Sequence, residues 1–131
     1  MKIKEVKSHI IQYDLKEELG YSQQYYQKRT GHLVEVVTDE GITGWGECFG
    51  PGNVAIANKV IVERVIQPII LGEDPLNRDV LWHRVYNLLR DHGQKGMPIQ
   101  ALSGVDIALW DIFGKVNGLC LVAHAHKICL L

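Results

Sequence analysis

Residues 101–115 read ALSGVDIALWDIFGK, and their apolar side chains recur at the spacing of one helix face. The positions that would share this face are Ala101, Val105, Ala108, Leu109 and Ile112. Pro98 suits the first turn of such a helix, and Gly118 suits its end. Gly104 would cost about 1 kcal/mol relative to alanine unless another element packs closely on it. The stretch therefore predicts a long amphipathic helix with a tight contact at Gly104.

Two further helices are predicted before this one. The first begins after Asn53, a suitable N-cap, and ends near Pro68, with its apolar face at Val54, Ala57, Ile61 and Val65. The second begins near Asp74-Pro75 and ends before Gly93, with its face at Leu81, Trp82, Val85, Leu88 and Leu89.

Three strands are predicted ahead of the helices, over residues 2–13, 32–38 and 42–48. Asp39-Glu40-Gly41 gives a short hairpin turn between the last two. The glycines on both sides of Trp45 indicate a close backbone approach or a bulge. The fold class that follows is α+β, a three-stranded antiparallel meander followed by a three-helix bundle.

Residues 14–30 are polar and aromatic and show neither a strand nor a helix period, which predicts a long loop. Such loops are uncommon in compact domains and tend to be functional or mobile. Its tyrosines combine apolar area with a hydrogen-bonding tip, which suits a lid over a polar substrate. The alternative is a surface loop that covers the sheet.

The sequence of 131 residues holds 14 basic and 15 acidic side chains, for a net charge of −1. This balance excludes the strongly basic surface of a typical nucleic-acid-binding domain and a polycation for membranes. No apolar run approaches the roughly 20 residues that span a bilayer, and no secretory signal follows Met1. The three cysteines cannot all pair within one chain, so we expect free thiols and a cytoplasmic protein.

Two clusters of ligand-type residues favour structural explanations. Asp106 and Asp111 are about 140° apart around a helix, so they cannot converge on one ion without other ligands. Buried carboxylates more often cap backbone groups or pair with cations, and Arg90 and Lys95 are natural partners. Zinc-binding residue types gather near the end of the sequence, but they crowd more closely than structural zinc sites do, so a chance cluster is favoured over a zinc site: Cys120, His124, His126 and Cys129.

Residues 101–115 also resemble a signature of the mandelate racemase/muconate lactonizing enzyme family, in the enolase superfamily. Gly44-Trp45-Gly46-Glu47 after a hairpin and Gly72-Glu73-Asp74-Pro75 between helices occur in the same order in that family. The segments 47–51 (ECFGP) and 90–96 (RDHGQKG) are most similar to its sugar-acid enzymes, of the galactarolactone cycloisomerase type. The resemblance extends over residues 1–119.

The resemblance implies a capping domain over the mouth of a (β/α)8 barrel. In the family, the segments that correspond to residues 14–30 and 49–53 close over the substrate, which implies Tyr21, Tyr25, Tyr26 and Phe49 as substrate-lining residues. Family chemistry removes the proton α to a carboxylate, leading to racemisation, dehydration or cycloisomerisation, and Mg²⁺ stabilises the enediolate. The metal ligands and bases lie on barrel strands, so we expect no catalytic residue, no metal ligand and no activity in this chain.

The resemblance stops after Leu119. We interpret residues 120–131 as a non-family tail, produced by truncation or a reading-frame shift, and predict a domain over residues 1–119. Helix faces that would pack on a barrel are expected to be exposed, so we expect a homo-oligomer that associates through them. The alternative is a stand-alone binding or assembly module with the same fold and no catalysis.

Overall fold

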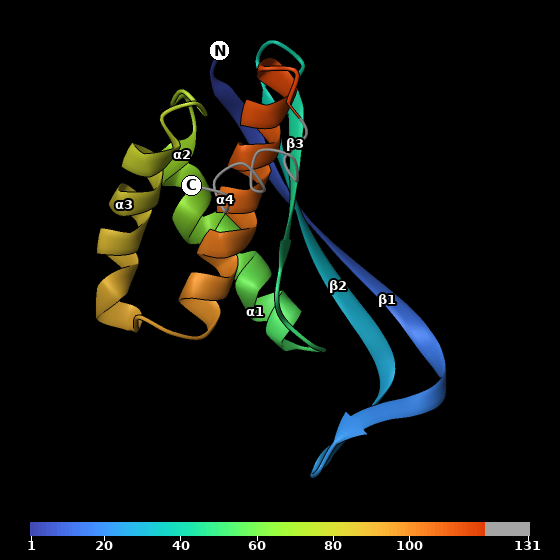
Figure 1. The fold of residues 1–131 in the computed structure, drawn as a ribbon. Helices are drawn as coiled ribbons and strands as arrows, with labels where there is room; N and C mark the ends of the chain where they lie inside the picture. The colour runs from blue at the N-terminus through green and yellow to red at the C-terminus, as the bar shows by residue number, and fades with distance from the viewer. Residues whose placement is uncertain (120–131) are drawn as a thin grey trace, which may run out of the picture.

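The computed structural model describes residues 1–119, in which three strands are followed by helices (Figure 1). β1 (Ile3–Tyr21), β2 (Gln24–Thr38) and β3 (Thr43–Cys48) pair in that order as an antiparallel sheet. The turn between β2 and β3 places Gly41 at a φ of 81°, a conformation that glycine adopts without strain. The predicted meander and α+β class are confirmed.

The loop predicted over residues 14–30 is wrong, because this segment is a β-ribbon. β1 and β2 continue past the predicted strand ends until Tyr21 lies opposite Gln24, with an irregularity in the pairing between Asp14 and Leu19. Figure 1 shows this distal ribbon reaching beyond the helices. Neither of its faces is covered there, so its sequence lacks the alternation of apolar and polar residues that marks a half-buried strand.

The helices follow the predicted order. Their bounds are α1 Val54–Val60, a π-helical turn Ile61–Ile66, α2 Gln67–Ile70, α3 Arg78–Leu89, a 3-10 turn Arg90–His92 and α4 Met97–Val116. Asn53 does occupy the N-cap position of α1, although its side chain makes no capping hydrogen bond. Pro68 lies in the first turn of α2 and does not end the helical segment.

The predicted apolar face of α1 and the following turn is displaced by one residue. The predicted positions are half-buried, whereas the fully buried ones are Ala55, Asn58, Val62, Ile66 and Ile70. On α3, Leu81, Val85 and Leu89 are buried as predicted, Trp82 is half-buried and Leu88 is exposed. On α4 the whole predicted face is buried.

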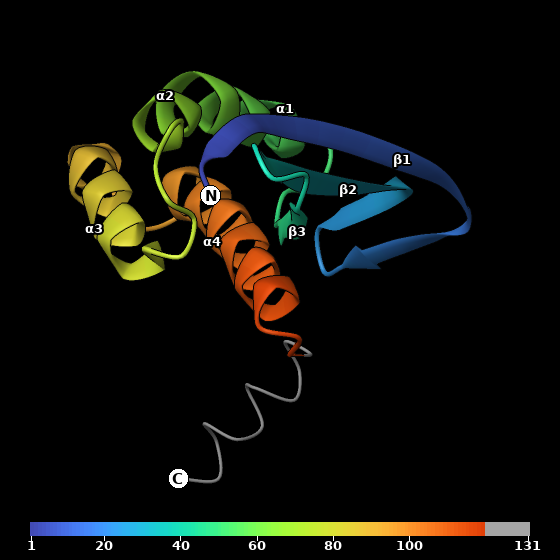
Figure 2. The same cartoon turned by 90° about the horizontal axis from the view of Figure 1, so that it is seen from above.

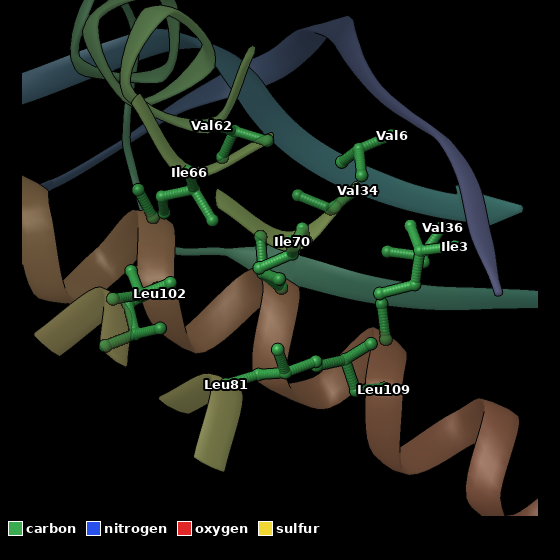
Figure 3. Packing of buried hydrophobic residues seen from close by; sticks show 14 of the residues in the cluster. Ile3, Val6, Val34, Val36, Val62, Ile66, Ile70, Leu81, Leu102 and Leu109 are labelled. Atoms are coloured by element: carbon green, nitrogen blue, oxygen red, sulfur yellow. The ribbon is translucent and has the colours of Figure 1, made fainter. Parts of the chain in front are cut away.

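All helices cover one face of the sheet, with α4 packed on the strands and α3 on the far side of α4 (Figure 2). Figure 3 shows the core that they enclose, in which strand, α2 and α4 side chains meet. The close approach predicted at the glycines is confirmed. A Cβ atom on Gly46 would overlap the carbonyl oxygen of Gly104, and one on Gly104 would overlap the sulfur of Cys48. β3 therefore lies backbone against backbone on α4.

Candidate functional site

An open hollow of about 280 Å³ lies between the distal ribbon and the segment that follows β3. It is lined by Leu15, Leu19, Tyr21, Tyr26, Lys28, Arg29, Thr30, Glu47, Cys48, Phe49, Gly50 and Pro51. The ribbon supplies the first seven of these residues and the end of β3 with its following turn supplies the rest. The site is therefore built from two segments that lie apart in the sequence.

Two tyrosines form the aromatic wall on the ribbon. The hydroxyl of Tyr26 donates a hydrogen bond to that of Tyr21 at 3.3 Å, and Tyr21 donates to Oε1 of Gln24 at 3.2 Å. Their ring centroids are 6.1 Å apart. The bond to Tyr21 raises the pKa of the Tyr26 hydroxyl, so Tyr26 remains a neutral hydrogen-bond donor.

Phe49 forms the opposite wall and is 70% exposed. Its backbone is fixed from below by Asn58 of α1, whose Nδ2 donates to the Phe49 carbonyl oxygen at 2.7 Å and to Oε1 of Gln100 at 3.1 Å. Gly50 lies so close to this amide that a Cβ atom there would be 3.0 Å from Asn58 Nδ2. The turn is thus held by the core while the phenyl ring stays free to contact a ligand.

The rim carries two basic side chains and one carboxylate. Lys28 pairs with Asp14 across the ribbon at 3.3 Å, whereas Arg29 has no ion pair within the part of the chain that the structure describes. Glu47 lies on the β3 side. Strand alternation puts Lys28 on the same face of β2 as Tyr26 and puts Arg29 on the opposite face, so an anionic ligand in the hollow would meet the ammonium group of Lys28.

The structure brings three of the four predicted lining residues together. Tyr21, Tyr26 and Phe49 share this hollow and a neighbouring one of about 550 Å³ that extends to Gln100. Tyr25 instead lines a third hollow of about 400 Å³, which Tyr26 and Gly52 also border. Successive residues of a strand point to opposite faces, so Tyr25 and Tyr26 cannot both face the same space squarely.

Sequence reasoning missed the basic and aliphatic lining residues. Tyr26, Lys28 and Thr30 alternate along β2 on the face that continues through His32 and Val34 into the core. Residues 14–30 lack the alternation of apolar and polar residues that would mark this face, so the sequence offered no signal for it.

Residues 1–119 offer few groups that could act as a nucleophile or bind a catalytic metal ion. Burial raises the pKa of the Cys48 thiol to about 12, so it does not serve as a nucleophile near neutral pH. The described part of the chain holds no group of three or more His, Cys, Asp or Glu side chains placed to bind a metal ion. The four zinc-type residues from Cys120 to Cys129 lie outside it.

The two helical aspartates, Asp106 and Asp111, lie beside charged groups other than Arg90 and Lys95, which the sequence had suggested as partners. Asp111 accepts hydrogen bonds from the backbone N–H of Trp45 at 2.9 Å and from Lys115 at 2.7 Å. Burial raises the pKa of Asp106, and the positive charge of Arg78 opposes this shift. Arg90 is paired instead with Asp91 at 3.8 Å.

A profile of the mandelate racemase / muconate lactonizing enzyme, N-terminal domain family matches residues 9–123. The chain belongs to this family. The match covers both walls of the hollow, α4 and the glycine contacts that join α4 to β3. The family's N-terminal domain thus accounts for nearly all of the described structure.

Relatives in the family include enzymes that act on sugar acids. The chain is 41% identical over 118 residues to D-galactarolactone cycloisomerase from Agrobacterium fabrum, covering 90% of this chain and 30% of the relative. The crystal structure of an enolase superfamily member from Polaromonas sp. JS666 superposes with a TM-score of 0.80 at 33% identity, over 89% of this chain and 31% of that one. The crystal structure of the 3,6-anhydro-D-galactonate cycloisomerase from Zobellia galactanivorans superposes with a TM-score of 0.75 at 31% identity. The superposition covers 89% of this chain and 29% of that one.

The chain thus spans less than a third of the length of these family members. None of the helices in residues 1–119 has the length and hydropathy that a bilayer-spanning helix needs.

Proposed function

We propose that residues 1–119 cap the active site of an enzyme that converts a sugar acid or a related hydroxy carboxylate. The observation that carries this proposal is the hollow that Tyr21, Tyr26 and Phe49 line together with Lys28. A hollow with aromatic walls, tyrosine hydroxyl groups and a lysine ammonium group is suited to a ligand that has both apolar C–H faces and a carboxylate. Its relatives' reactions support the same substrate class.

In this proposal each lining residue binds and none reacts. The rings of Tyr26 and Phe49 would pack on the carbon skeleton, and the tyrosine hydroxyls would hydrogen-bond to substrate hydroxyls. The Lys28 ammonium group would attract a carboxylate. Closing the ribbon over the substrate would also exclude water from the reacting atoms.

The reacting groups would come from outside residues 1–119. Family membership implies abstraction of the proton α to a carboxylate with Mg²⁺ as the stabilising ion, but the described residues offer no fitting set of ligands for this ion. We therefore place the Mg²⁺ site and the bases on a barrel domain, and the end of the capping domain near residue 119. Without a barrel, the chain with Mg²⁺ is expected to show no turnover of sugar acids.

A chimera tests this function. Residues 1–119 replace the aligned segment of the A. fabrum cycloisomerase, and kcat/KM is measured with galactarolactone and a panel of sugar acids. The chimera is expected to turn over at least one acid, and Y26A or F49A to lower kcat/KM by about tenfold through lost contacts.

Y13A is the matched control, because Tyr13 is an exposed tyrosine of β1 that does not line any of the three hollows described above. A folded chimera that converts no acid in the panel contradicts the proposal. So does an active chimera in which Y26A and F49A behave like Y13A. Specific association of the isolated chain with a partner protein, together with either result, would favour the stand-alone module.

A further inference from the structure

Each edge of the three-stranded sheet is contacted by an acidic and a basic side chain from one helical segment. At the β3 edge, Oδ2 of Asp111 accepts a hydrogen bond from the backbone N–H of Trp45 at 2.9 Å. Nζ of Lys115 donates to the carbonyl oxygen of Thr43 at 2.7 Å and to Asp111 at 2.7 Å. One outward-facing donor and one outward-facing acceptor of the edge strand are thereby satisfied.

The β1 edge has the same arrangement on a different helical segment. Oε1 of Glu63 accepts from the backbone N–H of Ser8 at 3.3 Å, and Nζ of Lys59 donates to the Ser8 carbonyl oxygen at 3.4 Å. Lys59 and Glu63 pair with each other at 3.6 Å. Further along this edge, the Ile3 backbone bonds to the residue pair 72–73, with N–H···O distances of 2.8 and 2.9 Å.

Both pairs have the same sequence spacing, four residues apart on a helical segment, which puts the two side chains on one face. The carboxylate takes the place of a neighbouring strand's carbonyl, and the ammonium takes the place of its N–H. We call each pair an edge clasp: Asp111–Lys115 at β3 and Lys59–Glu63 at β1.

Unpaired edges are templates for the addition of a strand from another molecule. We propose that the two edge clasps close the β1 edge at Ser8 and the β3 edge at Thr43 and Trp45 to strand addition by a second copy of this chain. An exposed surface ion pair by itself contributes little to stability. These pairs differ because each also bonds to backbone groups that an incoming strand would need. This inference is independent of the proposed function.

The test opens the β3 edge in the full chain with D111A/K115A. Amide exchange of Trp45, followed by NMR, is expected to accelerate by about tenfold or more once its charged acceptor is gone. Assembly, followed by sedimentation and thioflavin T fluorescence, is expected at concentrations at which the wild-type chain forms no β-rich aggregates. D111N retains an amide oxygen as acceptor, so it is expected to restore most of the protection.

K7A is the matched control, because Lys7 forms an exposed ion pair with Glu5 at 2.9 Å and, within residues 1–119, makes no hydrogen bond to an edge backbone group. A folded double variant with wild-type Trp45 exchange, or with no more assembly than K7A, overturns the proposal. If D111A/K115A does not fold, K115A alone decides, since it keeps the Asp111–Trp45 bond and frees Thr43. K115A that assembles no faster than K7A then contradicts the proposal, and faster assembly supports it.

Discussion

Two buried polar side chains lie next to residues that line the hollow: Asn58 bonds to Phe49, and His32 is paired on the sheet with Cys48. His32 and Asn58 are both 0% exposed, on β2 and α1 respectively. Asn58 donates two hydrogen bonds, whereas neither ring nitrogen of His32 has a hydrogen-bond partner within residues 1–119.

His32 is expected to make the domain less stable in mild acid. Burial lowers the pKa of His32, and among the charges facing it Lys59 adds to this shift while Glu63 opposes it. The unfolded chain takes up the proton first, so stability is complete above a pH of about 6.5 and falls below it. The Tm of the wild type should drop between pH 7.5 and 5.5. H32L should lose much of that drop, whereas H92Q, a change at an exposed histidine, should keep it. An equal drop in H32L and wild type would contradict this assignment.

Asn58 is expected to stabilise the fold and the Phe49 turn. N58A leaves the Phe49 carbonyl oxygen without its donor and opens a small cavity, at a cost of about 2 kcal/mol in the free energy of unfolding. N117A is the matched control, because Asn117 also donates to a backbone carbonyl, of Phe113 at 2.8 Å, but is exposed. N117A should cost less than about 0.5 kcal/mol. Urea unfolding measures both, and equal costs would refute the role of Asn58.

At the scale of elements, the contact between β3 and α4 depends on glycine. G46A would press a methyl group into the backbone of Gly104 and Ala108, which cannot move aside as a side chain can. We expect a loss of about 3 kcal/mol. G31A is the control, because a Cβ atom at Gly31 on the same strand layer meets nothing within 4 Å and should change stability by less than about 0.5 kcal/mol. Thermal unfolding checks both, and a G46A protein as stable as G31A would disprove the close contact.

These elements also show what the sequence could predict. α4 has a continuous buried face and a glycine that needs a close neighbour. The sequence therefore predicted the helix, its buried face and its close contact at Gly104. Locally encoded packing of this kind leaves a periodic pattern.

Two elements left no such pattern. The distal ribbon is exposed on both faces, so its pairing and the lining roles of Lys28 and Arg29 were not apparent. In α1 a buried position is occupied by the polar Asn58, and a π-helical turn follows, so counting apolar residues at helical spacing selected the wrong face. In both cases the structure depends on tertiary contacts, which leave no periodic pattern in the local sequence.

At the scale of the whole molecule, exposed apolar side chains on the helices are expected to mediate self-association of the isolated chain. Val80 and Leu88 of α3 are 58% and 53% exposed. V80K/L88K should weaken concentration-dependent association in sedimentation. I11K is the control, since Ile11 is 56% exposed but lies on the sheet. An unchanged association constant in V80K/L88K would show that α3 is not the contact.

The central claim is that the hollow walled by Tyr21, Tyr26 and Phe49 closes over a substrate. The most direct measurement is a crystal structure of the chimera with a bound sugar acid or a non-reacting analogue. We predict that atoms of Tyr26 and Phe49 lie within about 4.5 Å of the ligand, the distance of a side-chain contact. A ligand bound in the barrel with the ribbon and Phe49 turned away from it would contradict the account.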